Sequence, residues 1–256
     1  SSSGKGQTRM ESQEDVENSW HYAHENCRGD CNKVIVEKVI DFNYELTLMT
    51  VRHRGNENSD GKNSEGENSE NDIVSFCPPI IHKQKDGDFC ESWQAPSIIA
   101  TNALCECKKI AKLMVNELGG YGIFGVEFFI KNSIVYFNEM SPRPHDTAMV
   151  TLKTQNMSQF ELHIRAIMNI PIPKIETDLV GVSIPLICHN NGYKNNDYEN
   201  NDKSDLLEIP KSIFENKNAS IYIFGKPCVN GRRRMGLLIY LAPTINMAIN
   251  KLNEMK

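Results

Sequence analysis

Hydrophobic and polar positions follow two different periods along this chain. Residues 45–51, ELTLMTV, alternate as a half-buried strand does. Residues 103–118 instead carry apolar side chains at helical spacing, at Leu104, Ala111, Val115 and Leu118. The pair Gly119-Gly120 follows and ends the predicted helix, because glycine is a poor helix former.

The same patterns predict the other elements. A hairpin with strands at 123–130 and 135–140 turns around Asn132-Ser133. Further strands are expected at 33–36, 181–188, 220–224 and 235–241, and helices at 158–168 and from Pro243 onward. Since strands and helices mix without a regular βαβ repeat, the pattern favours an α+β fold with mainly antiparallel sheets.

Two segments contrast with this regular pattern. Residues 55–72 and 190–205 are rich in Asn, Ser, Glu, Asp and Gly, and we interpret both as disordered insertions because they cannot bury enough apolar surface to fold. We divide the chain into a larger domain, residues 1–172, and a smaller β-rich C-terminal domain, residues 173–256.

Charge and cysteine content narrow the function classes. The net charge of −5 argues against a nucleic-acid binder, so any anion site must be local. No apolar run approaches the roughly 20 residues of a membrane span. The eight cysteines include no CxxC pair with matching histidines, which favours reduced thiols and a cytoplasmic protein.

A pair of carboxylates in the predicted hairpin is the first candidate site. With a three-residue loop at 132–134, Glu127 and Glu139 are directly opposite and share one face, about 5 Å apart. Two carboxylates this close repel each other unless a cation lies between them, and Mg²⁺ typically takes one or two protein carboxylates. The alternative is that one of the two glutamates faces solvent.

Two further stretches suggest anion binding. In the opening run SSSGKGQ, Gly4 and Gly6 allow backbone N–H groups to approach an anion, although the run also suits a plain surface turn. Lys226 and the run Arg232–Arg234 form a local basic cluster, which could clamp a phosphate or could be a solvated basic turn.

Several runs together resemble one enzyme family. They are SSSGKGQ, VIVEKVIDFNYELTLMTVRH (34–53), HKQKDGDFCESWQ (82–94), GGYGIFGVEFFIKNSIVYFNEMSPRPHDTAMVT (119–151), NMSQFELHIRAI (156–167) and FGKPCVNGRRRMG (224–236). In this order they resemble the formate-dependent phosphoribosylglycinamide formyltransferases of purine synthesis, which are ATP-grasp enzymes. The resemblance covers nearly the whole chain outside the two insertions.

The resemblance implies roles for individual residues. Glu127 and Glu139 match magnesium ligands, and Asp146 matches the catalytic group that meets the glycinamide end of the acceptor substrate. Lys226, Arg233 and Arg234 match residues that hold the acceptor's 5′-phosphate. The residues that match ATP contacts are Ser2, Ser3, Gly4, Lys5, Gly6 and Gln7 over the phosphates, Glu37, Lys38, Val39 and Ile40 at adenine, and Glu45 at the ribose.

The implied reaction has two steps and needs ATP and Mg²⁺. Formate attacks the γ-phosphate of ATP, and the amine of glycinamide ribonucleotide then attacks the resulting formyl phosphate. The resemblance also implies that the chain is a fragment of a longer, homodimeric enzyme, with little activity alone. Two alternatives are an ATP-grasp carboxylase acting on aminoimidazole ribonucleotide and a non-catalytic ATP-grasp relic that still binds nucleotide.

Overall fold

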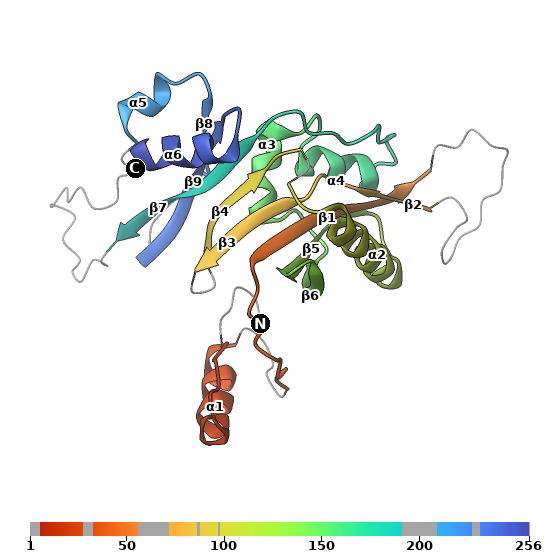
Figure 1. Ribbon diagram of the computed structural model, residues 1–256, viewed down its shortest axis with the longest axis vertical. Helices are drawn as coiled ribbons and strands as arrows, with labels where there is room; N and C mark the ends of the chain where they lie inside the picture. Colours follow the sequence, from red (N-terminus) through yellow and green to blue (C-terminus); the bar gives the residue numbers. More distant parts are fainter. Residues whose placement is uncertain are drawn as a thin grey trace.

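The computed structural model describes residues 6–27, 33–55, 72–85, 88–96, 98–190, 209–226 and 231–255 (Figure 1). Its helices are η1 (Gln13–Asp15), α1 (Val16–Asn26), α2 (Thr101–Leu118), η2 (Asp146–Val150), α3 (Thr151–Thr154), α4 (Gln159–Ile167), α5 (Lys211–Phe214) and α6 (Ile245–Met255). Its strands are β1 (Tyr44–Arg54), β2 (Asp72–Phe76), β3 (Ile80–Lys85), β4 (Asp88–Gln94), β5 (Gly122–Lys131), β6 (Ile134–Ser141), β7 (Gly181–Asn190), β8 (Ala219–Ile223) and β9 (Gly231–Leu241).

One continuous sheet joins all the strands of the described residues. The strand order is β6-β5-β1-β3-β4-β7-β9-β8, with β2 also paired to β1, and every pairing is antiparallel. The expected α+β fold with antiparallel strands is therefore confirmed. The link between the two ends of the sheet is the short pairing of β4 with β7, centred on Trp93 and Val182.

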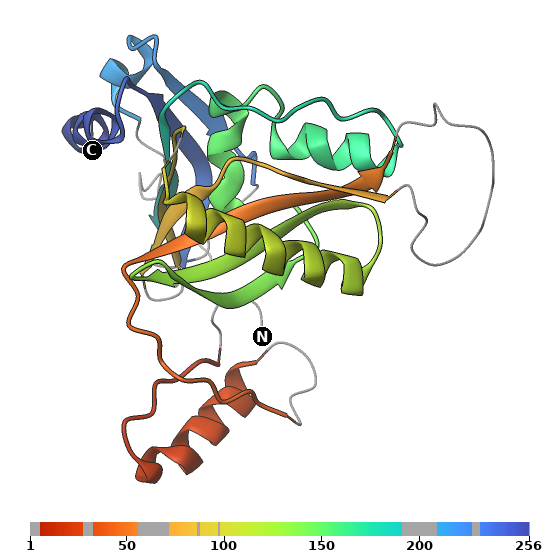
Figure 2. The same ribbon diagram turned by 45° about the vertical axis from the view of Figure 1, so that its right-hand side comes forward.

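The long strand β1 divides the core into two faces. Its even-numbered apolar residues Leu46 and Leu48 pack with β5 and with the inner side of α2. Its odd-numbered residues Met49 and Val51 face the other way, toward α4 and the segment that includes η2. Figure 2 shows α2 and α4 on opposite sides of the sheet. Alternation along β1 thus leaves Glu45 and Thr47 on the same face as η2.

A third apolar cluster supports the C-terminal end of the sheet. Val182 and Ile184 of β7 pack with Leu238 of β9 and with Ala248 and Leu252 of α6. The strands β8 and β9 lie at this end of the sheet, and β9 contains the basic residues Arg232–Arg234.

Three expectations about the chain differ from the structure. Residues 33–36 form no strand: Ile35 and Val36 are 86% and 73% exposed, so this β-prone run has no strand partner among the described residues. The helix α1 and the strands β2, β3 and β4 were not anticipated. Cys27 is disulfide-bonded, which corrects the expectation of reduced thiols throughout. Most of both predicted insertions lies outside the described residues.

Candidate active site

The carboxylates of Glu127 and Glu139 lie opposite each other on β5 and β6, but the connection differs from the expected one. The turn contains two residues, Asn132 and Ser133, both with positive φ, as a tight hairpin turn requires. Taken alone, a two-residue turn pairs Glu127 with Asn138. A bulge after Glu127 shifts the register by one residue and restores the pairing of Glu127 with Glu139.

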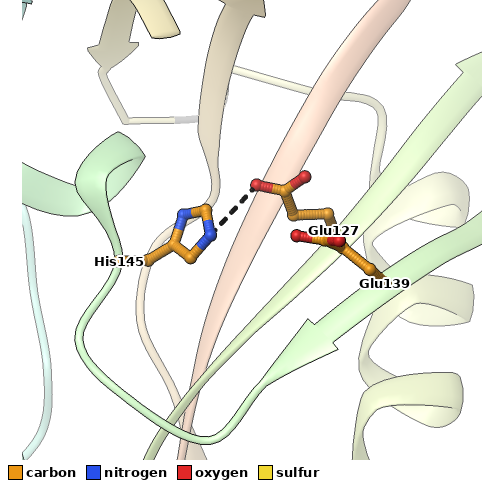
Figure 3. Close-up of side chains that lie close together, drawn as sticks. All are labelled: Glu127, Glu139 and His145. Carbon is orange, nitrogen blue, oxygen red and sulfur yellow. Dashed lines mark ion pairs between the residues drawn. The ribbon is translucent and has the colours of Figure 1, made fainter. Parts of the chain in front are cut away.

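Both carboxylates point to the same side of the sheet. A carboxylate oxygen of each and a ring nitrogen of His145 lie within 4.8 Å of one another (Figure 3). Glu127 is buried at 2% exposure, whereas Glu139 is exposed at the edge of this cluster. Glu139 is thus solvent-exposed, as the alternative expected of one of the two glutamates, while its carboxylate still lies close to that of Glu127.

Glu127 is in an unusual electrostatic position. Burial, then the charges of Glu139 and Glu45, raise its pKa to about 8. Its Oε1 atom is buried and accepts no hydrogen bond among the described residues. A buried carboxylate oxygen without a donor is destabilising unless a cation completes its surroundings.

Two histidines face that oxygen. His145 Nε2 lies 3.4 Å and His82 Nε2 lies 3.9 Å from Glu127 Oε1. Burial is the main cause that lowers the pKa of His145 to about 4 and that of His82 to about 3, so both rings are neutral near pH 7. The His145 ring packs against Gly125 of β5, where an added Cβ would come within 3.1 Å of the ring.

The residues of this cluster fit a divalent cation. Carboxylate oxygens are hard ligands that suit Mg²⁺, and a neutral imidazole is a ligand for several transition metals. The uncoordinated Oε1 of Glu127 is the atom that such an ion would satisfy. A bound cation there would supply neutralisation of phosphate charge.

A second group of residues surrounds a pocket of about 100 Å³ next to this cluster. Its polar members are Asp146, Lys226 and Arg234, and its apolar members include Phe89 and Met149. Arg234 donates a hydrogen bond of 2.6 Å from a guanidinium nitrogen to Asp146 Oδ2. Lys226 donates to the Arg234 carbonyl over 2.6 Å. The pocket thus has two cations and one carboxylate at its mouth.

Arg233 has a different place from the other predicted acceptor residues. It follows Arg232 on β9, alternates with Arg234 across the strand, and does not line the pocket. It remains close enough for its charge to matter, because partial burial and then Arg233 and Arg234 lower the pKa of Lys226. Arg232 pairs instead with Asp88 of β4.

The predicted nucleotide contacts are only partly assembled. Glu45 lies at the start of β1 on the cluster's face, accepts a hydrogen bond from the Gln84 backbone over 3.1 Å, and adds to the charge felt by Glu127. Glu37, Lys38 and Val39 are exposed and Ile40 is half-buried, all outside any strand. Gly6 has a positive φ and lies against α1 at Ala23, and Gln7 is exposed. Ser2, Ser3, Gly4 and Lys5 lie outside the described residues.

Sequence reasoning did not single out His82 or His145. His145 was inside a quoted motif, directly before Asp146, but its role depends on a fold-back that no local pattern reveals. His82 is 45 positions away from Glu127 and reaches it because β1 lies between β3 and β5. The position of His145, directly before Asp146 and shortly after Glu139, is the signal in the sequence that could have identified it.

Comparison with known proteins agrees with this architecture. Residues 1–160 match the family model described as "ATP-grasp domain", and the chain belongs to the ATP-grasp family. ATP-grasp enzymes use ATP with a divalent metal ion. Residues 204–255 match the family model described as "PurT, C-terminal". None of the helices in the described part of the chain combines the length and apolar character that a membrane crossing needs.

Named relatives narrow the class further. The chain is 42% identical over 254 residues to a formate-dependent phosphoribosylglycinamide formyltransferase of Syntrophotalea carbinolica, and 43% identical over 249 residues to one of Francisella tularensis. These alignments cover 99% and 97% of this chain and 58% and 57% of the relatives. The chain therefore spans little more than half the length of these relatives.

Solved structures show the same fold. An ADP complex of N5-carboxyaminoimidazole ribonucleotide synthetase matches with a TM-score of 0.74 at 22% identity, covering 100% of this chain and 58% of that one. A structure described as glycinamide-RNase-transformylase T from Mycobacterium tuberculosis matches with a TM-score of 0.61 at 26% identity, covering 86% and 56%.

Proposed function

We propose that this chain carries the ATP-grasp body and C-terminal part of a formate-dependent phosphoribosylglycinamide formyltransferase. In this proposal Glu127 and Glu139 hold a Mg²⁺ ion that binds the phosphates of ATP, and the pocket at Asp146 receives glycinamide ribonucleotide. The observation that carries the proposal is the adjacency of the two sites, since consecutive residues serve both. His145 belongs to the carboxylate cluster and Asp146 to the basic pocket.

The proposed chemistry matches this adjacency. A formate oxygen attacks the γ-phosphorus of ATP, the bond to the β-phosphate oxygen breaks, and ADP leaves. The acceptor amine then attacks the formyl carbon, inorganic phosphate leaves, and the amine loses a proton. Because formyl phosphate hydrolyses in water, the amine must lie next to the site where it forms.

The protein's own groups account for positioning in this scheme. Lys226 and Arg234 offer positive charge to the acceptor's phosphate, and Arg233 adds charge nearby. The Asp146 carboxylate is held by Arg234 at one oxygen. We assign it to orienting the acceptor amine and accepting its proton. Glu45, with Ser2–Gln7 and Glu37–Ile40, is proposed to contact the nucleotide.

The test compares ligands and substrates on the full chain. Calorimetry should show ATP binding that strengthens with Mg²⁺, and glycinamide ribonucleotide binding that does not depend on the metal. ADP release should then be assayed with formate plus glycinamide ribonucleotide, and separately with bicarbonate plus aminoimidazole ribonucleotide. ADP release with the second pair alone would identify a carboxylase, and nucleotide binding without acceptor binding would identify a non-catalytic relic.

A further inference from the structure

A hydrogen-bonded chain connects the two histidines behind Glu127. His82 Nδ1 lies 3.1 Å from Thr47 Oγ1, Thr47 Oγ1 lies 2.7 Å from Thr147 Oγ1, and Thr147 Oγ1 lies 2.9 Å from His145 Nδ1. All four side chains are buried. The chain therefore begins and ends on imidazole rings whose other nitrogens both face Glu127 Oε1.

The number of available protons restricts how the hydrogen bonds between His82 and His145 can be arranged. Its three hydrogen bonds need three protons, and the two threonine hydroxyls supply two. The third must come from an imidazole Nδ1–H, so at least one ring carries its proton at Nδ1. A neutral ring of that kind has a bare lone pair at Nε2, pointing toward Glu127.

The hydrogen bonds between His82 and His145 can run in either direction, and each direction has a different consequence for His145. If His82 donates at Nδ1, its Nε2 can accept from the Gln84 side-chain amide 3.3 Å away, and His145 Nε2–H faces the Glu127 carboxylate. If His145 donates at Nδ1 to Thr147, its bare Nε2 faces a carboxylate oxygen 3.4 Å away. Two lone pairs in that position repel each other unless a proton of the Glu127 carboxyl or a metal cation lies between them.

We propose that His145 Nε2 is a third protein ligand of the cation held by Glu127 and Glu139, and that Thr147, Thr47 and His82 fix its ring orientation and tautomer. The inference rests on the proposed metal–nucleotide site and adds a nitrogen donor to it. Metal-bound histidines commonly donate their second ring N–H to an acceptor of the protein, and here that acceptor is the Thr147 hydroxyl. Gly125 leaves the space that the ring occupies.

The nitrogen donor should change metal preference. Imidazole binds Mn²⁺ and later first-row metals more readily than Mg²⁺, which prefers oxygen ligands. We therefore expect His145→Ala to raise the Kd for Mn²⁺ about tenfold and the Kd for Mg²⁺ by clearly less. Thr147→Val should raise the Kd for Mn²⁺ about tenfold through loss of ring orientation, and Thr147→Ser should restore it.

Electron spin-echo spectroscopy tests the ligand directly. The full chain is loaded with Mn²⁺ alone, without nucleotide, so that adenine nitrogens cannot contribute. Modulation from ¹⁴N should appear, and it should change to the ¹⁵N pattern when the histidines are ¹⁵N-labelled. This comparison uses the wild-type chain and does not depend on any variant folding. Absence of nitrogen modulation in the Mn²⁺-loaded chain would overturn the inference.

Variants locate the nitrogen and separate the two proposals. His145→Ala should lose the modulation, while His53→Ala should keep it. His53 is a matched control because it is also buried and its Nε2 is hydrogen-bonded to Ser75. It lies near the end of β1, away from Thr47 and the carboxylate cluster. Modulation that persists in His145→Ala would refute the ligand role.

Glu127→Gln distinguishes failure of this inference from failure of the proposed function. If Glu127→Gln loses Mn²⁺ affinity but wild-type spectra lack nitrogen, the metal site stands and His145 is not a ligand. If Glu127→Gln binds Mn²⁺ as tightly as wild type, the metal role of the glutamates fails, and the third-ligand inference fails with it.

Discussion

The metal-free chain should lose stability as pH rises above neutrality, and Glu127→Gln should remove that loss. The pKa of Glu127 is raised in the folded protein to about 8, from an ordinary value of 4.5. Between these two pH values the folded chain keeps a proton that the unfolded chain has released. Raising the pH through this window therefore favours unfolding, and the loss is complete above about pH 8.

The magnitude follows from the same pKa values. The full window corresponds to a loss of about 5 kcal/mol in the free energy of unfolding. His82 and His145 act in the opposite direction below pH 6.5, because their lowered pKa values leave the unfolded chain with more protons. Between pH 6.5 and pH 8.5 the Glu127 effect amounts to about 2 kcal/mol. The remainder of the histidine effect in this range is smaller and is shared by wild type and Glu127→Gln, so it cancels in their difference.

Urea unfolding in the presence of EDTA measures this effect. Wild type and Glu127→Gln are compared at pH 6.5 and pH 8.5, and the difference in their free energies of unfolding should shift by about 2 kcal/mol in favour of the variant. Added Mg²⁺ should stabilise wild type at pH 8.5 much more than the variant, because only wild type retains the negatively charged carboxylate at this position.

Glu139→Gln serves as the graded control. It removes the charge that ranks second, after burial, among the causes of the raised pKa of Glu127, so it should reduce the pH-dependent loss without abolishing it. If the difference in the free energy of unfolding between wild type and Glu127→Gln is the same at pH 6.5 and pH 8.5, the pKa of Glu127 is not raised. The claim that the buried Glu127 carboxylate needs a cation to complete its surroundings would then be wrong.

Three further outcomes test other parts of the molecule. Glu139→Gln should weaken ATP binding measured with Mg²⁺, and unchanged magnesium dependence would remove its metal role. Arg234→Ala should raise the Kd of glycinamide ribonucleotide by about 10- to 100-fold, the range for a charge-assisted hydrogen bond, and should leave ATP affinity nearly unchanged; a larger effect on ATP would contradict the acceptor pocket. Gly236→Ala should destabilise the chain by about 1–3 kcal/mol in urea unfolding, because its Cβ would lie 2.5 Å from the Tyr222 carbonyl oxygen; unchanged stability would show that β8 and β9 can separate easily.

The sequence allowed the hairpin and its carboxylate pair to be predicted, but for an incomplete reason. Alternating apolar residues located both strands, and a three-residue loop brought Glu127 opposite Glu139. The chain instead combines a two-residue turn with a bulge, and the two differences cancel. Turn length and bulges both change register by one residue, so a local pattern cannot separate these combinations.

Other parts of the site depend on contacts that are distant in sequence. Strands β3 and β4 were missed because residues 80–94 carry His, Lys, Gln and Glu among their apolar positions. The chain from His82 to His145 crosses three separate segments, and only the pairing of β1 with its neighbours brings them together. The run at 33–36 was wrongly assigned to a strand because propensity alone does not supply a partner strand.

A buried side chain of α4 holds the segment that joins the two proposed subsites. Gln159 of α4 accepts a hydrogen bond from the His145 backbone N–H over 2.7 Å and donates one to the His145 carbonyl over 2.9 Å. The Gln159 amide thus holds both polar backbone groups of His145, which belongs to the carboxylate cluster and directly precedes Asp146. Because α4 packs through Leu162 and Ala166 into the core beneath β1 and β5, the sheet and helix together fix this segment. The proposed function passes a water-sensitive intermediate from a metal–phosphate site to an acceptor pocket, and in that function Gln159 of α4 would contribute the rigidity that such a transfer needs.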